Sequence, residues 1–91
     1  MDEQSETDRI LRQVGTDDAI GQLNNLIESG TQPRDQLYYK LGNAYRKKGN
    51  FREAINCYLE AMSVNPDSPA TEAHRMLMDI IEYYHKDYYN P

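Results

Sequence analysis

The sequence predicts an all-α protein built as a stack of about five helices, and three observations support that prediction. Apolar residues recur at steps of three and four along most of the 91-residue chain, which is the spacing of one helix face. Glycine and proline stand between the periodic segments, where helices usually end. One apolar pattern also returns thirty-five residues later, as it does in stacked helical repeats.

The central element is a predicted helical hairpin whose two helices are separated by Gly49-Asn50. The apolar stripe before the break is Leu37, Tyr38, Leu41, Ala44 and Tyr45, and the stripe after it is Ala54, Ile55, Tyr58, Ala61 and Met62. Glycine accepts the left-handed conformation that often ends a helix. Asn50 is then the expected cap of the next helix, with Glu53 as its capping-box partner.

A further helix is predicted at residues 69–86. Pro66 ends the second helix of the hairpin, because proline lacks the amide hydrogen and restricts the residue before it. Ser68-Pro69 has the composition of an N-cap followed by a first turn. The apolar stripe of this helix comprises Ala70, Ala73, Met76, Leu77, Ile80, Ile81 and Tyr84.

The N-terminal third repeats the second-helix pattern in an abbreviated form. Its stripe is Ala19, Ile20, Leu23, Leu26 and Ile27, with the same offsets as the stripe that begins at Ala54. Ile10, Leu11 and Val14 form a shorter helical pattern before it. We expect Gly15 to end that short helix, which gives a shortened first hairpin and brings the expected number of helices to about five.

Charge and size exclude several function classes. The net charge is -5 and the pI is about 4.8, and binding to nucleic acid needs a basic surface that such a chain lacks. Only residues 31–68 are net positive, with six basic and four acidic residues. A chain of this size has little material to enclose a catalytic cleft. Because no signal or membrane-spanning pattern is visible, a soluble, cytoplasmic protein is expected, with no membrane partner.

Residues 35–68 resemble the tetratricopeptide repeat. The stretch reads DQLYYKLGNAYRKKGNFREAINCYLEAMSVNPDS. Its signature positions are Tyr38 (where the family usually has Trp), Leu41, Gly42, Tyr45, Gly49, Phe51, Ala54, Tyr58, Ala61 and Pro66. The resemblance implies an α–α superhelix in one domain over residues 1–91. Within it we expect a degenerate repeat at 5–30, a full repeat at 35–68 and a capping helix at 69–87.

The resemblance also implies a function, because in this family the first helix of each repeat lines a concave groove that receives a peptide. On this helix the residues outside the core stripe are Gln36, Tyr39, Lys40, Asn43, Arg46 and Lys47. We therefore expect an adaptor or scaffold that binds another protein or peptide through these residues. The alternative is an ordinary solvated face, with basic residues that complement the C-terminal helix dipole. Lys40, Asn43 and Arg46 match one repeat's share of a carboxylate clamp, but no neighbouring helix supplies the rest.

No catalytic residue, metal ligand or cofactor is predicted. Glu82 and His85 have the spacing of a di-iron motif, which requires a second copy that the sequence lacks. Cys57, the lone cysteine, is expected to be a small buried hydrophobe. The C-terminal tyrosines are Tyr83, Tyr84, Tyr88 and Tyr89. Tyr84 belongs to the core stripe, and the other three are expected to cover the hairpin or to contact a second chain. We therefore expect a monomer, with a homodimer formed through the terminal helices as the alternative.

Overall fold

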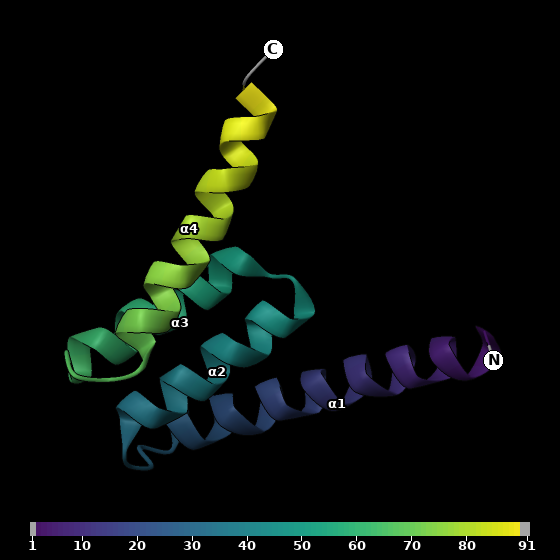
Figure 1. Cartoon of the computed structure of the whole chain (residues 1–91). Helices are drawn as coiled ribbons and strands as arrows, with labels where there is room; N and C mark the ends of the chain where they lie inside the picture. Colours follow the sequence, from purple (N-terminus) through teal and green to yellow (C-terminus); the bar gives the residue numbers. More distant parts are fainter. Residues whose placement is uncertain (1, 90–91) are drawn as a thin grey trace.

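The computed structural model describes the backbone of residues 2–89 and the side chains of residues 15–83, and it confirms the all-α class. Over that backbone the chain forms four helices and no strand: α1 (Asp2–Glu28), α2 (Arg34–Lys48), α3 (Phe51–Val64) and α4 (Ala70–Tyr89). Each helix packs against the next one along the chain. Figure 1 shows α2 and α3 as the central hairpin, with α1 beside α2 and α4 against α3.

The expected helix break at Gly15 is wrong, which is why the described chain has four helices instead of about five. Gly15 lies inside α1, which runs without interruption from Asp2 to Glu28. A glycine in a helix interior costs only about 1 kcal/mol relative to alanine, and adjacent helical residues offset that cost. Gly15 is also followed by Ala19 after four residues, whereas Gly49 precedes Ala54 by five. The segment after Gly15 therefore does not reproduce the spacing of the hairpin turn at Gly49.

Gly49 ends α2 as predicted. It has the left-handed φ of 92°, and its amide donates to the Arg46 carbonyl at 3.0 Å, while the Asn50 amide donates to the Tyr45 carbonyl at 2.9 Å. The Asn50 side chain then accepts a hydrogen bond from the Glu53 amide at 3.4 Å and caps α3. Local sequence signals therefore set both sides of the hairpin turn.

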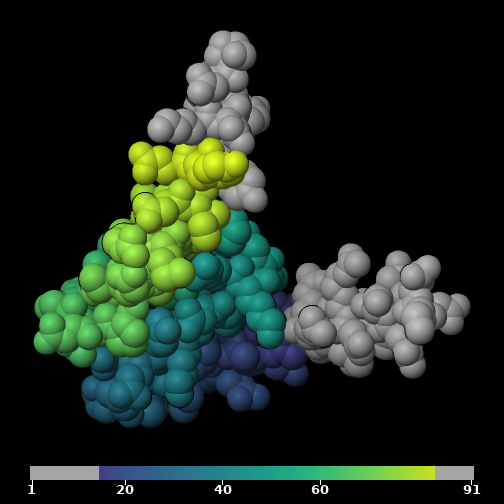
Figure 2. All heavy atoms as spheres, viewed as in Figure 1, coloured from purple at the N-terminus to yellow at the C-terminus, as the bar shows by residue number. Residues whose placement is uncertain are grey.

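The main core lies where α2, α3 and α4 meet. Its buried members are Ala54, Tyr58, Ala61, Ala70, Ala73 and Leu77, and half-buried side chains packed against it are Tyr38, Tyr39, Tyr45, Ile55, Met62 and Ile81. Most of the buried members are alanines, so the helices approach closely and two larger side chains fill the space that remains. In Figure 2 the side chains of α3 and α4 form one continuous body over this region.

Two residues of the predicted apolar stripes, Leu26 and Met76, lie at the surface, as does the signature residue Phe51. Met76 of α4 is 45% exposed and Phe51 at the start of α3 is 38% exposed. Met76 precedes the fully buried Leu77 by one residue, and adjacent positions on a helix point about 100° apart, so a stripe centred on Leu77 turns Met76 outward. Ile80 and Ile81 are half-buried, whereas the side chain of Tyr84 lies outside the described residues.

The start of α4 is fixed by the predicted Ser68 cap. The Ser68 side chain is buried and its Oγ accepts a hydrogen bond from the Ala70 amide at 3.1 Å. Just before it, the Asn65 Nδ2 donates to Asp35 Oδ2 at 3.0 Å and joins the end of α3 to the beginning of α2. The turn between α3 and α4 is therefore fixed to the start of α4 by Ser68 and to the start of α2 by Asn65.

Candidate functional site

The six residues predicted to line a groove all lie on α2, and they differ in exposure. Gln36, Lys40, Asn43 and Lys47 are exposed, whereas Tyr39 and Arg46 are half-buried. The apolar face of the same helix is covered, with Leu37, Leu41 and Gly42 buried. The helix thus presents a polar face with amide and ammonium donors beside a well-packed interior.

The close crossing of α2 and α3 positions this polar face. A Cβ atom built on Gly42 would lie 2.6 Å from Cε1 and 2.7 Å from Cδ1 of Tyr58, which is far inside van der Waals contact. Tyr58 is fully buried. The Tyr58 ring therefore occupies the space that a side chain at Gly42 would need, and the surrounding core holds the ring in that position.

The Tyr58 hydroxyl reaches the polar face and donates a hydrogen bond to Asn43 Oδ1 at 2.6 Å. Burial raises the pKa of the Tyr58 hydroxyl, and the nearby Arg46 opposes that rise. The hydroxyl is therefore protonated at neutral pH and serves as a donor. Since the Asn43 oxygen is occupied, its Nδ2 amide group is left for a ligand.

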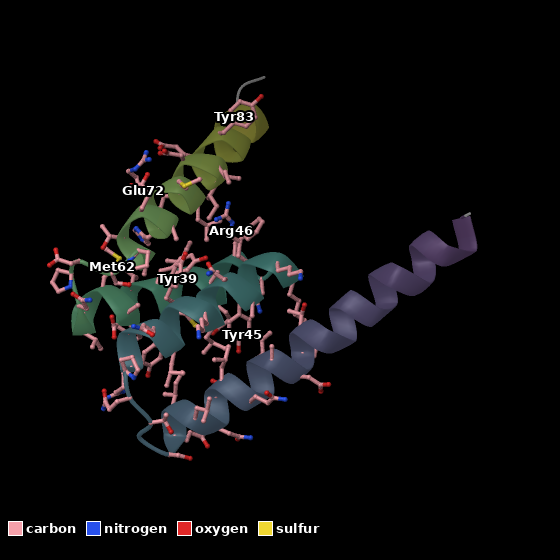
Figure 3. The ribbon with its side chains drawn as sticks, turned by 60° about the horizontal axis from the view of Figure 1, so that its bottom comes forward. Tyr39, Tyr45, Arg46, Met62, Glu72 and Tyr83 are labelled. Atoms are coloured by element: carbon pink, nitrogen blue, oxygen red, sulfur yellow. The ribbon has the colours of Figure 1, made fainter. Side chains whose placement is uncertain are left out.

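Tyr39 and Arg46 lie on the side of α2 that faces α4 (Figure 3). The Tyr39 ring is tilted by 39° against the Tyr58 ring, with 6.2 Å between centroids, a separation typical of aromatic pairs in protein interiors. Tyr39 therefore has a structural role in addition to any contact with a ligand.

The other side of α2 faces α1, and there the structure adds residues that sequence reasoning missed. A pocket of about 390 Å³ is lined by Gly15, Thr16, Ala19, Asn43, Ala44 and Lys47. The residues of α1 were missed because Gly15 was expected to end a helix, so that Gly15, Thr16 and Ala19 were not placed together on one face of a continuous helix. The spacing Gly15, Thr16, Ala19 is the only sequence signal, since these residues fall on one face of a continuous helix.

Two cations at the end of α2 have different surroundings. Lys48 Nζ lies 2.8 Å from Asp17 Oδ1 of α1, and hydrogen bonding to Asp17 raises the pKa of Lys48. Over the side chains described, no carboxylate lies within 4.0 Å of the neighbouring Lys47. Among the described side chains Lys47 is thus not paired with a carboxylate, while Lys48 ties α2 to α1.

Neither a metal site nor a reactive thiol emerges from the described side chains. No three of their histidine, cysteine, aspartate and glutamate residues are grouped for metal binding. The Glu82–His85 pair stays untested because the His85 side chain lies outside the described residues, as do those of Tyr84, Tyr88 and Tyr89. Cys57 is buried as predicted, and burial raises the pKa of its thiol to about 11, which disfavours the nucleophilic thiolate. No helix in the described part of the chain is long and apolar enough to cross a membrane.

Comparisons with known proteins identify the repeat and the fold. Residues 36–68 match the family described as tetratricopeptide repeat. RNA polymerase II-associated protein 3 from rat is 31% identical over 78 residues, and the human protein is 32% identical over 77 residues. These matches cover 82% and 77% of this chain but only 12% of each relative. A Bacteroides fragilis protein solved by NMR in solution is 39% identical with a TM-score of 0.73, over 99% of this chain and 91% of that one.

Proposed function

We propose that this chain, which belongs to the tetratricopeptide-repeat family, is an adaptor that binds a segment of another protein along the polar face of α2. The repeats of this family are protein–protein interaction modules and are generally non-enzymatic. The observation that carries the proposal is the division of α2 into two faces. Leu37, Leu41 and Gly42 are buried on one face. On the other face the helix exposes Lys40 and Asn43.

The chemistry of this face favours a ligand that supplies hydrogen-bond acceptors. Lys40 and Lys47 are ammonium donors, and Asn43 presents its Nδ2 group because its oxygen is bonded to Tyr58. An extended peptide offers such acceptors in its backbone carbonyls and in acidic side chains. The relatives' name, which records an association with RNA polymerase II, accords with an interaction role.

A peptide selection tests the proposal. Twelve-residue peptides displayed on phage are selected against the immobilised chain, and the best binder is measured by isothermal titration calorimetry. Substituting alanine for Lys40, Asn43 and Arg46 together should weaken binding at least roughly tenfold, since each side chain removed is a donor to the ligand. Circular dichroism should show unchanged helicity, because these side chains are exposed or half-buried.

A matched control is available on α3. Arg52 and Asn56 are exposed there and stand four residues apart, so the double variant Arg52→Ala with Asn56→Ala removes one cation and one amide from a different face. The control should bind the selected peptide as tightly as the wild type does. Equal binding by the α2 triple variant would place the ligand elsewhere on the protein.

Self-association is a second candidate function, and one observation favours it. On α4 the side chains of Met76 and Met78 are 45% and 41% exposed, and exposed methionines are common at adaptable protein interfaces. Under this alternative the chain forms a homodimer through its terminal helices and the α2 face has no ligand. Sedimentation velocity distinguishes the two, because the proposed adaptor sediments as a monomer over the whole concentration range.

A further inference from the structure

The pocket between α1 and α2 owes its volume to small residues on both helices. Gly15 and Ala19 lie one turn apart on α1, and Ala44 faces them from α2. A Cβ atom built on Gly15 would have no heavy atom within 4 Å. The helices therefore meet here without filling the space between them, whereas at Gly42 the Tyr58 ring fills it.

Two hydrogen-bond donors of α2 line this pocket. Asn43 lines it while its oxygen accepts from the Tyr58 hydroxyl at 2.6 Å, which leaves Nδ2 as the group available to a ligand. Lys47 also lines it, and among the described side chains its ammonium group has no carboxylate within 4.0 Å, whereas Lys48 pairs with Asp17. The pocket thus combines walls of glycine, alanine and Thr16 with one amide donor and one cation. Its volume, about 390 Å³, lies near the lower end of the ~300–1,000 Å³ range of ligand pockets.

We propose that this pocket is an anchor subsite which takes one aliphatic side chain from an extended partner segment carrying an acidic residue next to that side chain. The apolar walls fit the aliphatic group, Asn43 Nδ2 donates to a backbone carbonyl beside it, and Lys47 pairs with the acidic residue. The inference rests on the proposed function and deepens it, because it moves the binding site from α2 alone to the seam that α2 makes with α1.

The pocket can be tested without knowing the natural partner. The probe is N-acetyl-leucine-N-methylamide, a leucine side chain between two carbonyl groups, titrated into ¹⁵N-labelled protein and followed by NMR. We expect saturable shifts of the backbone amides of Gly15, Thr16, Ala19 and Ala44. The glycine analogue of the probe, which has no side chain, should produce no saturable shift. Shifts that do not saturate, or that are equal for both compounds, overturn the inference.

Two leucine substitutions on α1 provide a matched pair. Gly15 lines the pocket and Gly21 does not, yet both lie within α1 and neither has a heavy atom within 4 Å of a built Cβ. Gly15→Leu fills the pocket and should abolish saturation by the leucine probe. Gly21→Leu adds the same side chain outside the pocket and should leave the titration unchanged. Because leucine favours helix over glycine, both variants keep α1 folded, which circular dichroism verifies.

The contribution of Lys47 is tested with a longer probe, N-acetyl-Leu-Asp-N-methylamide. It should bind the wild type several-fold more tightly than the leucine probe does, and Lys47→Ala should remove that gain, so that the two probes bind the variant with equal affinity. No gain from the aspartate in the wild type would overturn the acidic part of the inference.

The outcomes separate this inference from the proposed function. If a phage-selected peptide binds the wild type and the Gly15→Leu variant equally, the adaptor function stands and the anchor subsite is wrong. A roughly tenfold or greater loss in Gly15→Leu, with none in Gly21→Leu, supports both, since one apolar contact in a pocket is worth up to about two orders of magnitude. If no peptide is selected, the adaptor proposal fails, and the leucine probe alone then decides whether the pocket binds aliphatic groups.

Discussion

The two sides of α2 are packed to different degrees. Towards α3 and α4 the core residues Tyr58, Ala61, Ala70 and Leu77 are fully buried, and Gly42 has no room for a methyl group. Towards α1 the apolar residues of that helix are only half-buried or exposed, and Thr16 is its one buried side chain over the residues described. Small residues therefore have opposite effects on the two sides, since they permit contact in one place and leave a pocket in the other.

The largest expected effect comes from truncating one leucine on each side. Leu77→Ala removes a fully buried side chain of α4 and should destabilise the protein by about 2–5 kcal/mol. Leu23→Ala removes a half-buried side chain of α1 and should destabilise the protein by about 1 kcal/mol. The cost is smaller because folding removes less of the apolar surface of Leu23 from contact with water. Urea denaturation of both variants gives the two values, and equal losses would contradict the difference in packing.

Replacing one glycine on each side should change stability in opposite directions. Gly42→Ala places a methyl group against the buried Tyr58 ring and should cost about 1–3 kcal/mol by overpacking. Gly15→Ala meets no neighbouring atom and should gain about 0.5–1 kcal/mol from better helix propensity. Thermal melts of the two variants measure both changes in stability. A midpoint that shifts in the same direction in both variants would contradict the difference in packing between the two sides of α2.

A smaller effect is expected at the hydrogen bond that joins the packed core to the polar face. Tyr58→Phe keeps the ring against Gly42 and removes only the hydroxyl that donates to Asn43. The loss should be about 0.5–1.5 kcal/mol, as for an ordinary hydrogen bond, since the exposed Asn43 oxygen can turn to water. In an NMR spectrum the Asn43 side-chain amide signals should move while backbone amides in α4 stay in place. A cooperative loss of structure would mean that the hydroxyl supports the core itself.

The smallest effect is expected at the exposed ion pair between α1 and α2. Hydrogen bonding to Asp17 raises the pKa of Lys48 above its ordinary value of 10.5. The stability that this pair contributes is therefore fully present below pH 10.5 and is lost as the pH rises through the higher folded-state pKa. The melting difference between the wild type and Lys48→Met should be small at pH 7 and absent once Lys48 is deprotonated. A difference that persists at the higher pH would have to come from the lysine's aliphatic chain.

Sequence reasoning predicted the hairpin well because its signals are local. The Gly49 turn, the Asn50 cap and the Ser68 cap each depend on residues within one or two turns of the helix end, and their chemistry is independent of the rest of the fold. The same reasoning was wrong at Gly15, because a glycine ends a helix only where the next residues also leave the helical conformation. The exposure of Met76 was missed for a related reason. The apolar pattern alone does not show which residue of the stripe faces the neighbouring helix most directly, and residues at the edge of the stripe can be exposed.

The sequence by itself determined the all-α class, the repeat at residues 36–68 and the polar character of the outer face of α2, since helix periodicity and capping are properties of short segments. The tertiary structure decided at which small residues the adjacent space is filled by another side chain and at which it stays open. Gly42 meets Tyr58 from a helix sixteen residues away in sequence, and Gly15 meets nothing. The same packing placed the Tyr58 hydroxyl on Asn43 and brought α1 beside Lys47, because distances between side chains on different helices depend on how the helices cross.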